Sequence, residues 1–229
     1  MWRPCRHRST KKVLPLKTKD RILKEALRLF NEQGFANVTT AALAQSVGIA
    51  EGNLWYHFNN KRALMEALTL DFIASADARL ELQPRDDDTI IEEYAGFLSV
   101  FAQELTQFGF LYRDQTDYGE HSPALLEVLP RLYRDSQKQF SNFFAALVRT
   151  GHLAWPQTQI GDLATNATII VRYGLEFFRE SGQSFRSTEQ AVEQIINQQL
   201  TLFAHELKPT SRDRLKRALE EERTTRLAA

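Results

Sequence analysis

Apolar residues recur along this chain of 229 residues at the three- and four-residue spacing of an α-helix, and they almost never alternate with polar residues as in a strand. The Asn-Gly and Asp-Gly turns of two-residue β-hairpins are absent from the sequence. This pattern argues against a sheet and predicts an all-α fold. The spacing predicts helices over residues 18–34, 39–48, 50–58, 61–82, 90–105, 123–151, 160–181 and 188–207.

Composition indicates a globular protein that does not span a membrane. Hydrophobic residues make up 43% and charged residues 25% of the chain, and charges interrupt each apolar run before the roughly 20 residues that a membrane helix needs. The single cysteine, Cys5, cannot form an internal disulfide, and the first residues lack the apolar segment of a secretory signal. We therefore expect a cytoplasmic protein.

Charge is distributed unevenly along the sequence. Residues 1–62 contain twelve Lys and Arg but four Asp and Glu, a net charge of +8, and because the whole chain has 29 of each kind the remainder carries −8. A basic segment joined to an acidic body is typical of a protein whose basic part meets a polyanion such as nucleic acid. For residues 1–16 a second interpretation stays open, that of a solvated arm without a binding role.

Residues 39–58 predict two short helices joined by a tight turn at Gly48. Thr39 is placed to cap the first helix. The exposed face of the second helix is polar and aromatic, and its Asn53 has the donor and acceptor groups that read a base edge. The pair has the form of a helix-turn-helix, whose second helix enters the major groove. The alternative is a surface helix of a bundle.

Residues 17–77 resemble the amino-terminal domain of the TetR family of bacterial transcriptional regulators. The matching motifs are Leu29-Phe30, Gly34-Phe35, Thr39-Thr40, Leu43-Ala44, Val47-Gly48-Ile49, Gly52-Asn53-Leu54-Trp55-Tyr56-His57-Phe58, Lys61 and Leu64. Two positions depart from the family pattern: Trp55 replaces the usual Tyr, and Ala50 replaces the Ser or Thr that opens the third helix, a loss of about 1 kcal/mol. The resemblance implies an all-α protein with a three-helix DNA-binding domain followed by a helical effector and dimerisation bundle.

The resemblance also implies two kinds of contact with double-stranded DNA. Glu51, Gly52 and Asn53 take the base-reading positions, where a glycine lets the backbone come close and an amide pairs with adenine. Contacts with the phosphate backbone are assigned to Lys19, Thr39, Thr40, Trp55, Tyr56, His57 and Lys61. For a dimer with two such helices, the operator is expected to be nearly palindromic.

By the same resemblance, the rest of the chain binds a small apolar or amphipathic effector and forms a homodimer. The candidate effector residues are Tyr112, Arg113, Phe144, Arg172, Tyr173 and Phe177. The candidate dimer residues, on the last two strongly apolar helices, are Ala167, Val171, Gly174, Val192, Ile196 and Phe203. Two other interpretations stay open, because aromatic residues at helical spacing also build ordinary cores and the two helices also fit an internal hairpin.

These inferences divide the chain into a basic arm over residues 1–16, a DNA-binding domain over 17–77, an effector and dimerisation domain over 78–207 and a charged tail over 208–229. No catalytic motif occurs and the five histidines are scattered, so we expect no enzyme, no cofactor and no metal site. The expected function is that of a repressor released from its operator by the effector. The alternative is a DNA-binding factor for protein interaction or nucleoid association, without a small ligand.

Overall fold

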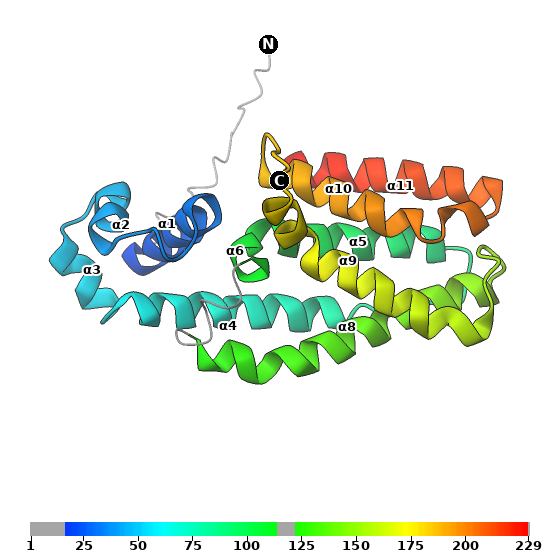
Figure 1. Ribbon diagram of the computed structural model, residues 1–229, viewed down its shortest axis with the longest axis horizontal. Coiled ribbons are helices and arrows are strands. Elements are labelled where there is room, and N and C mark those ends of the chain that lie inside the picture. The colour runs from blue at the N-terminus through cyan, green and yellow to red at the C-terminus, as the bar shows by residue number, and fades with distance from the viewer. Residues whose placement is uncertain (1–16, 114–121, 229) are drawn as a thin grey trace, which may run out of the picture.

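The computed structural model describes residues 17–113 and 122–228, so the predicted basic arm and Cys5 lie outside the described residues. The helices are α1 (Thr18–Gln33), α2 (Thr40–Val47), α3 (Glu51–His57), α4 (Lys61–Leu80), α5 (Ile90–Gln107), α6 (Gly109–Tyr112), α8 (Pro123–Arg149), α9 (Ile160–Glu180), α10 (Thr188–Thr201) and α11 (Pro209–Ala228), with 3₁₀ turns η1 (Gln157–Gln159) and η2 (Ala204–Glu206) (Figure 1). These described parts contain no strand, and the all-α prediction is confirmed. None of their helices combines the length and the apolar character that crossing a membrane requires.

Helices α1, α2 and α3 form a head at one end of the molecule, and α4 leads from the head into the body (Figure 1). The head has a core of its own because α1 presents one apolar face, where Ile22, Ala26, Leu29 and Phe30 are buried at three- and four-residue spacing. Both α2 and α4 pack on α1, and α3 packs on α2. The short helices α2 and α3 are therefore held by tertiary packing rather than by their length.

Both ends of α2 are fixed by local interactions that the sequence predicts. The Thr39 side chain accepts a hydrogen bond from the Ala42 amide at 3.1 Å and caps the first turn. At the other end, Gly48 has a φ of 75°, the left-handed conformation that other residues resist. Arg21 of α1 donates to the Val47 carbonyl at 2.7 Å. The turn between α2 and α3 therefore has one defined geometry.

Helix α5 is the central helix of the body. Eleven of its 18 residues are buried because α4, α6, α8, α10 and α11 all pack against it. Its Phe97 packs against Phe140 and Phe143 of α8, with ring centroids 5.0 and 4.7 Å apart. Aromatic pairs at such distances add to the stability that burial provides. Much of the aromatic content that the sequence shows is therefore core.

The segment over residues 208–229 differs from the predicted charged tail. It forms α11, which lies along α5 (Figure 1) and buries Leu215 and Ala218. Arg214 adds an ion pair with Glu92 of α5, at 2.7 Å. Few apolar residues sit among many charges here, so the sequence pattern is weak although the helix belongs to the body.

The loop before α5 is held by side-chain contacts other than a helix cap. Thr89 takes the N-cap position, but its side chain makes no capping hydrogen bond. The Asp87 carboxylate instead accepts a hydrogen bond from the Thr89 amide at 2.8 Å. Asp86 pairs with Arg149 of α8 at 2.6 Å, which ties the loop to the body.

Helices α9 and α10 pack against each other within the single chain. Five of the six predicted dimer residues are buried inside this chain: Ala167, Val171, Val192, Ile196 and Phe203. The sixth, Gly174, lies against Ile195, because a Cβ built on it would come within 2.6 Å of the Ile195 Cγ1. The arrangement is the internal hairpin that the sequence leaves open, and Gly174 allows its helices to approach closely.

We expect Gly174→Ala to lower the free energy of unfolding by about 1–3 kcal/mol, because Ile195 is fully buried and has no space into which to move. Gly161→Ala, in the first turn of the same helix, is the matched control, since no atom lies within 4 Å of its added Cβ. The control is expected to be neutral or to stabilise by up to about 1 kcal/mol. Urea unfolding followed by circular dichroism measures both, and equal stability of the two variants contradicts the close packing.

Candidate functional site

The outer face of α3 carries the residues that the sequence assigns to base reading. Glu51, Gly52 and Asn53 form the first turn of this helix and are exposed. Leu54 is fully buried and holds the helix to the head, whereas Tyr56 is 84% exposed. Helix α3 therefore directs donor, acceptor and aromatic groups away from the protein.

The two threonines at the start of α2 make different contacts. Thr39 caps the helix, whereas the Thr40 hydroxyl donates to the Glu51 carboxylate at 2.7 Å and links the start of α2 to the start of α3. Glu51 thus has a partner inside the head. Asn53 has no hydrogen-bond partner for its side chain within the described ranges, so its amide is available to a ligand.

Gly52 lies at a position where a side chain would meet nothing. No atom lies within 4 Å of the Cβ that could be built on it, and its φ is outside the left-handed region. The fold of this chain therefore does not require a glycine there. A ligand that comes close to the backbone of α3 does require one, as the base-reading assignment implies.

The predicted contacts with the phosphate backbone surround this face. Trp55 and His57 are partly buried, and the Tyr56 ring packs edge-on against His57 with centroids 5.3 Å apart. Lys19 of α1 is exposed, and its amine lies 5.5 Å from the centroid of the Phe58 ring, near the end of α3. Hydrogen-bond donors from α2 and α1 thus lie near the start and the end of α3, beside the donors of α3 itself.

Lys61 differs from the other predicted DNA contacts because its amine is used inside the head. The amine donates to the Phe35 carbonyl and lies 4.2 Å from the centroid of the Phe35 ring. Burial lowers the pKa of Lys61. The ammonium has three N–H donors, and the structure assigns at least one of them to the packing of α4 on the turn after α1.

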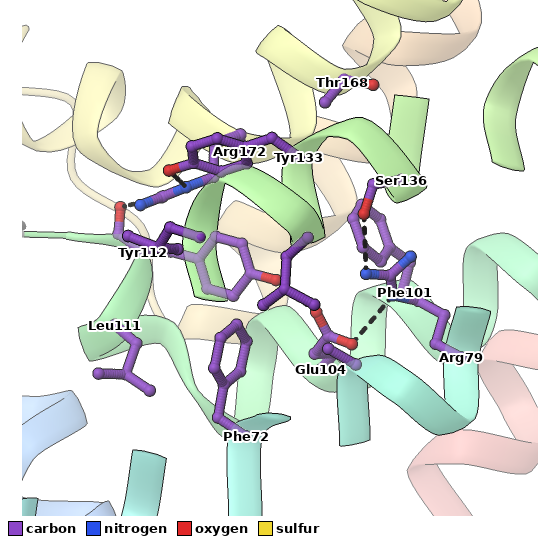
Figure 2. A pocket seen from close by; sticks show the side chains of 13 residues that line it. Phe72, Arg79, Phe101, Glu104, Leu111, Tyr112, Tyr133, Ser136, Thr168 and Arg172 are labelled. Atoms are coloured by element: carbon purple, nitrogen blue, oxygen red, sulfur yellow. Dashed lines mark hydrogen bonds and ion pairs between the residues drawn. The ribbon is translucent and has the colours of Figure 1, made fainter. Parts of the chain in front are cut away.

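A cavity of about 30 Å³ lies in the body where α4, α5, α6, α8 and α9 meet (Figure 2). A volume of this size holds about one or two waters. The apolar part of its wall consists of Phe72, Ala76, Phe101, Leu111, Leu129 and Leu132. Its polar part consists of Arg79, Glu104, Tyr112, Tyr133, Ser136, Thr168 and Arg172.

Arg79 of α4 and Glu104 of α5 form a buried ion pair at this cavity, with N and O 2.9 Å apart. The other two guanidinium nitrogens of Arg79 donate to Gln139 at 2.9 Å and Ser136 at 3.1 Å, both on α8. The second Glu104 oxygen accepts from the Tyr112 hydroxyl of α6. Burial and the negative charge of Glu104 raise the pKa of Tyr112 well above its usual value, so the hydroxyl stays a donor.

Arg172 of α9 reaches the same cavity from the opposite side (Figure 2). Its Nε donates to the Tyr133 hydroxyl at 2.8 Å and its Nη1 to the Tyr112 carbonyl at 3.1 Å. Its Nη2 is buried without a hydrogen-bond partner. The side chain thus has a free donor inside the body, where an unpaired polar group is costly.

Two of the predicted effector residues, Tyr112 and Arg172, line this cavity. Sequence reasoning missed Arg79 and Glu104, which line it as well. A signal for them exists in the sequence, because each charge stands within the apolar face of its helix. Charged residues are almost never fully buried unless they are paired, so two such positions of opposite sign indicate a buried ion pair.

The other four predicted effector residues lie elsewhere. Phe144 is fully buried beside Phe203, with ring centroids 5.1 Å apart, and is not part of the cavity wall. Tyr173 and Phe177 are 47% and 60% exposed on the outer face of α9. Arg113 is directed towards the head, where it donates to a backbone carbonyl of α1.

Asn31 of α1 joins the head to the body. Its side-chain amide donates to the Gln107 carbonyl at 2.8 Å, and its side-chain oxygen accepts from the Phe110 amide at 2.8 Å. Its backbone carbonyl accepts from Arg113. The head is therefore attached to the body both through the continuous helix α4 and through this contact with the junction of α5 and α6.

Comparisons with known proteins give the same family for both parts of the chain. Residues 75–215, more than half of the chain, match a family described as bacterial transcriptional repressor. Residues 22–68 match a family described as bacterial regulatory proteins, tetR family.

The tetracycline repressor protein class C from Escherichia coli is 34% identical over 101 residues, 42% of this chain and 41% of that protein. The class A repressor of transposon 1721 from Escherichia coli is 36% identical over 93 residues, 41% of this chain and 40% of that protein. The chain thus matches less than half the length of either relative.

Solved structures agree over most of the chain. A TetR-family transcriptional regulator from Marinobacter aquaeolei VT8 is similar with a TM-score of 0.72 and 26% identity, over 90% of this chain and 99% of that one. A gamma-butyrolactone receptor described as an ArpA-like protein has a TM-score of 0.57 and 16% identity, over 90% and 97% of the two chains. The second likeness concerns the fold alone.

We expect Lys61→Ala to lower the free energy of unfolding by about 1–2 kcal/mol, because the change removes both the hydrogen bond to Phe35 and the contact with its ring. Arg62→Ala is the control, since this neighbour is exposed and pairs only with Glu66 one turn further on. An exposed pair of this kind contributes about 0.5 kcal/mol or less. Urea unfolding of the full chain compares the variants, and a stability loss no larger than that of Arg62→Ala returns Lys61 to a purely DNA-contacting role.

Proposed function

Because this chain belongs to the TetR family of bacterial regulatory proteins, we propose that it is a homodimeric repressor that leaves a near-palindromic operator when a small effector binds in its body. The family consists of DNA-binding transcription factors, so the chain is a transcriptional regulator and not an enzyme. One observation carries the finer proposal: the turn at Gly48 holds α3 with Glu51, Gly52 and Asn53 exposed. A helix held in this way fits the major groove.

In this proposal, α3 reads the bases with Asn53, whose amide has no other partner within the described ranges. Gly52 lets the backbone of α3 come close to the base edges. The phosphate backbone is contacted by Lys19, Thr39, Thr40, Trp55, Tyr56 and His57. Lys61 supports the position of α4 rather than adding a separate contact. Asn53 is assigned to the bases because its amide has no partner within the described ranges, whereas Thr39 and Thr40 also make contacts inside the head.

The proposed dimer contact is an apolar stripe on the outer face of α9. Ile169, Tyr173 and Phe177 are spaced by four residues and are 50%, 47% and 60% exposed. Large apolar side chains that share one exposed face favour contact with another protein surface. A symmetric dimer satisfies this requirement by placing the same stripe of two chains in contact. The stripe takes the place of the predicted dimer residues, which are used inside the chain.

The proposed effector acts through α4. This helix contributes Phe72, Ala76 and Arg79 to the cavity, and it begins at Lys61, directly after α3. An effector larger than the cavity must open the body and therefore binds best to a conformation with α4 displaced. Such a difference in affinity weakens DNA binding, typically by about 5- to 150-fold. The naming of a relative as a tetracycline repressor supports a small-molecule effector.

An operator selected from a random DNA library with the full chain tests the DNA contact. We expect Asn53→Ala to cost about 1–3 kcal/mol on the selected operator and little on random DNA, because a base contact is lost while the phosphate contacts remain. Asn197→Ala, an exposed asparagine on α10, is the control for the same change. Titration of labelled duplexes with the unchanged chain and both variants gives all six affinities. An equal loss on operator and random DNA removes Asn53 from base reading.

Sedimentation velocity tests the dimer. We expect Phe177→Glu to weaken self-association by roughly 100-fold or more, because an interface that buries an unpaired carboxylate pays several kcal/mol. Leu70→Glu is the matched control, since Leu70 on α4 is 61% exposed and Phe177 is 60% exposed. If both Phe177→Glu and Ile169→Glu leave the assembly unchanged, the stripe on α9 is not the contact.

A further inference from the structure

Arg172 is a buried cation without a buried anion. The residue is 6% exposed, and two of its nitrogens donate to neutral oxygens, the Tyr133 hydroxyl and the Tyr112 carbonyl. Its Nη2 is buried and has no partner. No carboxylate pairs with this guanidinium in residues 17–113 or 122–228. Removing one partner from a buried charge pair is strongly destabilising. A buried Arg172 without an anion therefore lowers the stability of the ligand-free fold.

Arg79, on the other side of the same cavity, shows how this body satisfies a buried arginine. Each of its three nitrogens has a partner, and one of these partners is the Glu104 carboxylate at 2.9 Å. Glu104 is fully engaged, since its second oxygen accepts from Tyr112. Among the described residues, the charged side chains of the cavity wall are two arginines and one glutamate, and the positive charge without a counter-charge there is that of Arg172.

Arg172 also stands between the cavity and the outside. A groove of about 250 Å³ runs between α8 and α9, and Tyr133, Thr168 and Arg172 line both this groove and the cavity. Figure 2 shows Tyr133 beside Arg172, across the cavity from Phe72 and Leu111. Ile169 and Tyr173 form the outer part of the groove. A molecule that enters the groove from its α8 side, beside Arg134 and Gln137 and away from the proposed dimer stripe, therefore meets the free donor of Arg172 while its remaining atoms lie against apolar side chains.

We propose that the effector is an amphipathic carboxylate, an apolar molecule with one anionic group, and that Arg172 binds the carboxylate group. The proposal rests on the proposed function, since it names the chemical class of that effector. A carboxylate supplies both the missing acceptor for Nη2 and the missing negative charge, and guanidinium and carboxylate match as two parallel hydrogen bonds. A cationic ligand is excluded by the uncompensated charge, and a neutral amide supplies an acceptor without the charge.

Calorimetry with matched compounds tests this assignment on the full chain. The probes are two apolar bodies, naphthalene and a ten-carbon chain, each carrying a carboxylate, a primary amide or an amine: 2-naphthoate and decanoate with their amides and amines. We expect the better-fitting carboxylate to bind at least about 10-fold more tightly than its amide, and neither amine to bind. In Arg172→Gln the ratio of carboxylate to amide affinity is expected to fall to about one. Arg179→Gln makes the same change on the outer face of α9, and we expect it to leave the ratio unchanged.

Thermal melting and operator binding without ligand show that each variant is folded. If Arg172→Gln does not fold, Arg172→Lys serves instead, since it keeps the charge but loses the planar fork, and its ratio is expected to be lower than that of the unchanged chain but above one. An amide that binds as tightly as its carboxylate, or a ratio that survives in Arg172→Gln, overturns the carboxylate assignment and leaves the repressor proposal intact. If no compound binds and none alters operator affinity, the carboxylate assignment and the proposal of a small effector both fail. If the chain binds no operator, the proposed function fails, while calorimetry still decides the ligand class.

Discussion

Arg79 and Glu104 place two opposite charges inside the body with side chains 2% and 1% exposed, and such a pair is tolerated only if the remaining donors and acceptors are also met. Gln139 and Ser136 of α8 and Tyr112 of α6 meet them. Four helices are therefore fixed relative to one another by a single polar cluster, because a displacement of any one of them leaves a buried charge unpaired, at a cost of several kcal/mol. Apolar packing tolerates small shifts far better than this cluster does.

The cluster also determines where the body is adaptable. On its own side of the cavity Arg79 and Glu104 have their partners, whereas Arg172 on the other side has a free nitrogen and, among the described residues, neutral partners. The walls of one cavity thus combine a rigid part, centred on α4 and α5, with a part on α9 that a ligand can complete. Because Arg79 belongs to α4, a ligand that disturbs the rigid part acts on the helix that continues into the head.

Sequence patterns predicted the interactions between near neighbours in the chain. Thr39 and Gly48 act on residues within one or two turns, so the ends of α2 followed from residue types alone. Periodicity also located the helices, but it does not tell whether an apolar face is covered by the same chain or by another. Val171 and Ile196, which the family resemblance assigned to a dimer, are buried in one chain. The pair of Arg79 and Glu104, 25 residues apart, depends on how α4 and α5 cross, which no local pattern specifies.

The contact at Asn31 has a mechanical consequence. A rigid body held at one point turns freely, but one held at two points turns only about the line that joins them. The head is held by α4 and by the hydrogen bonds of Asn31 to Gln107 and Phe110, so these two attachments define a single axis of rotation. The distance of α3 from that axis sets how far its exposed turn swings for a given angle.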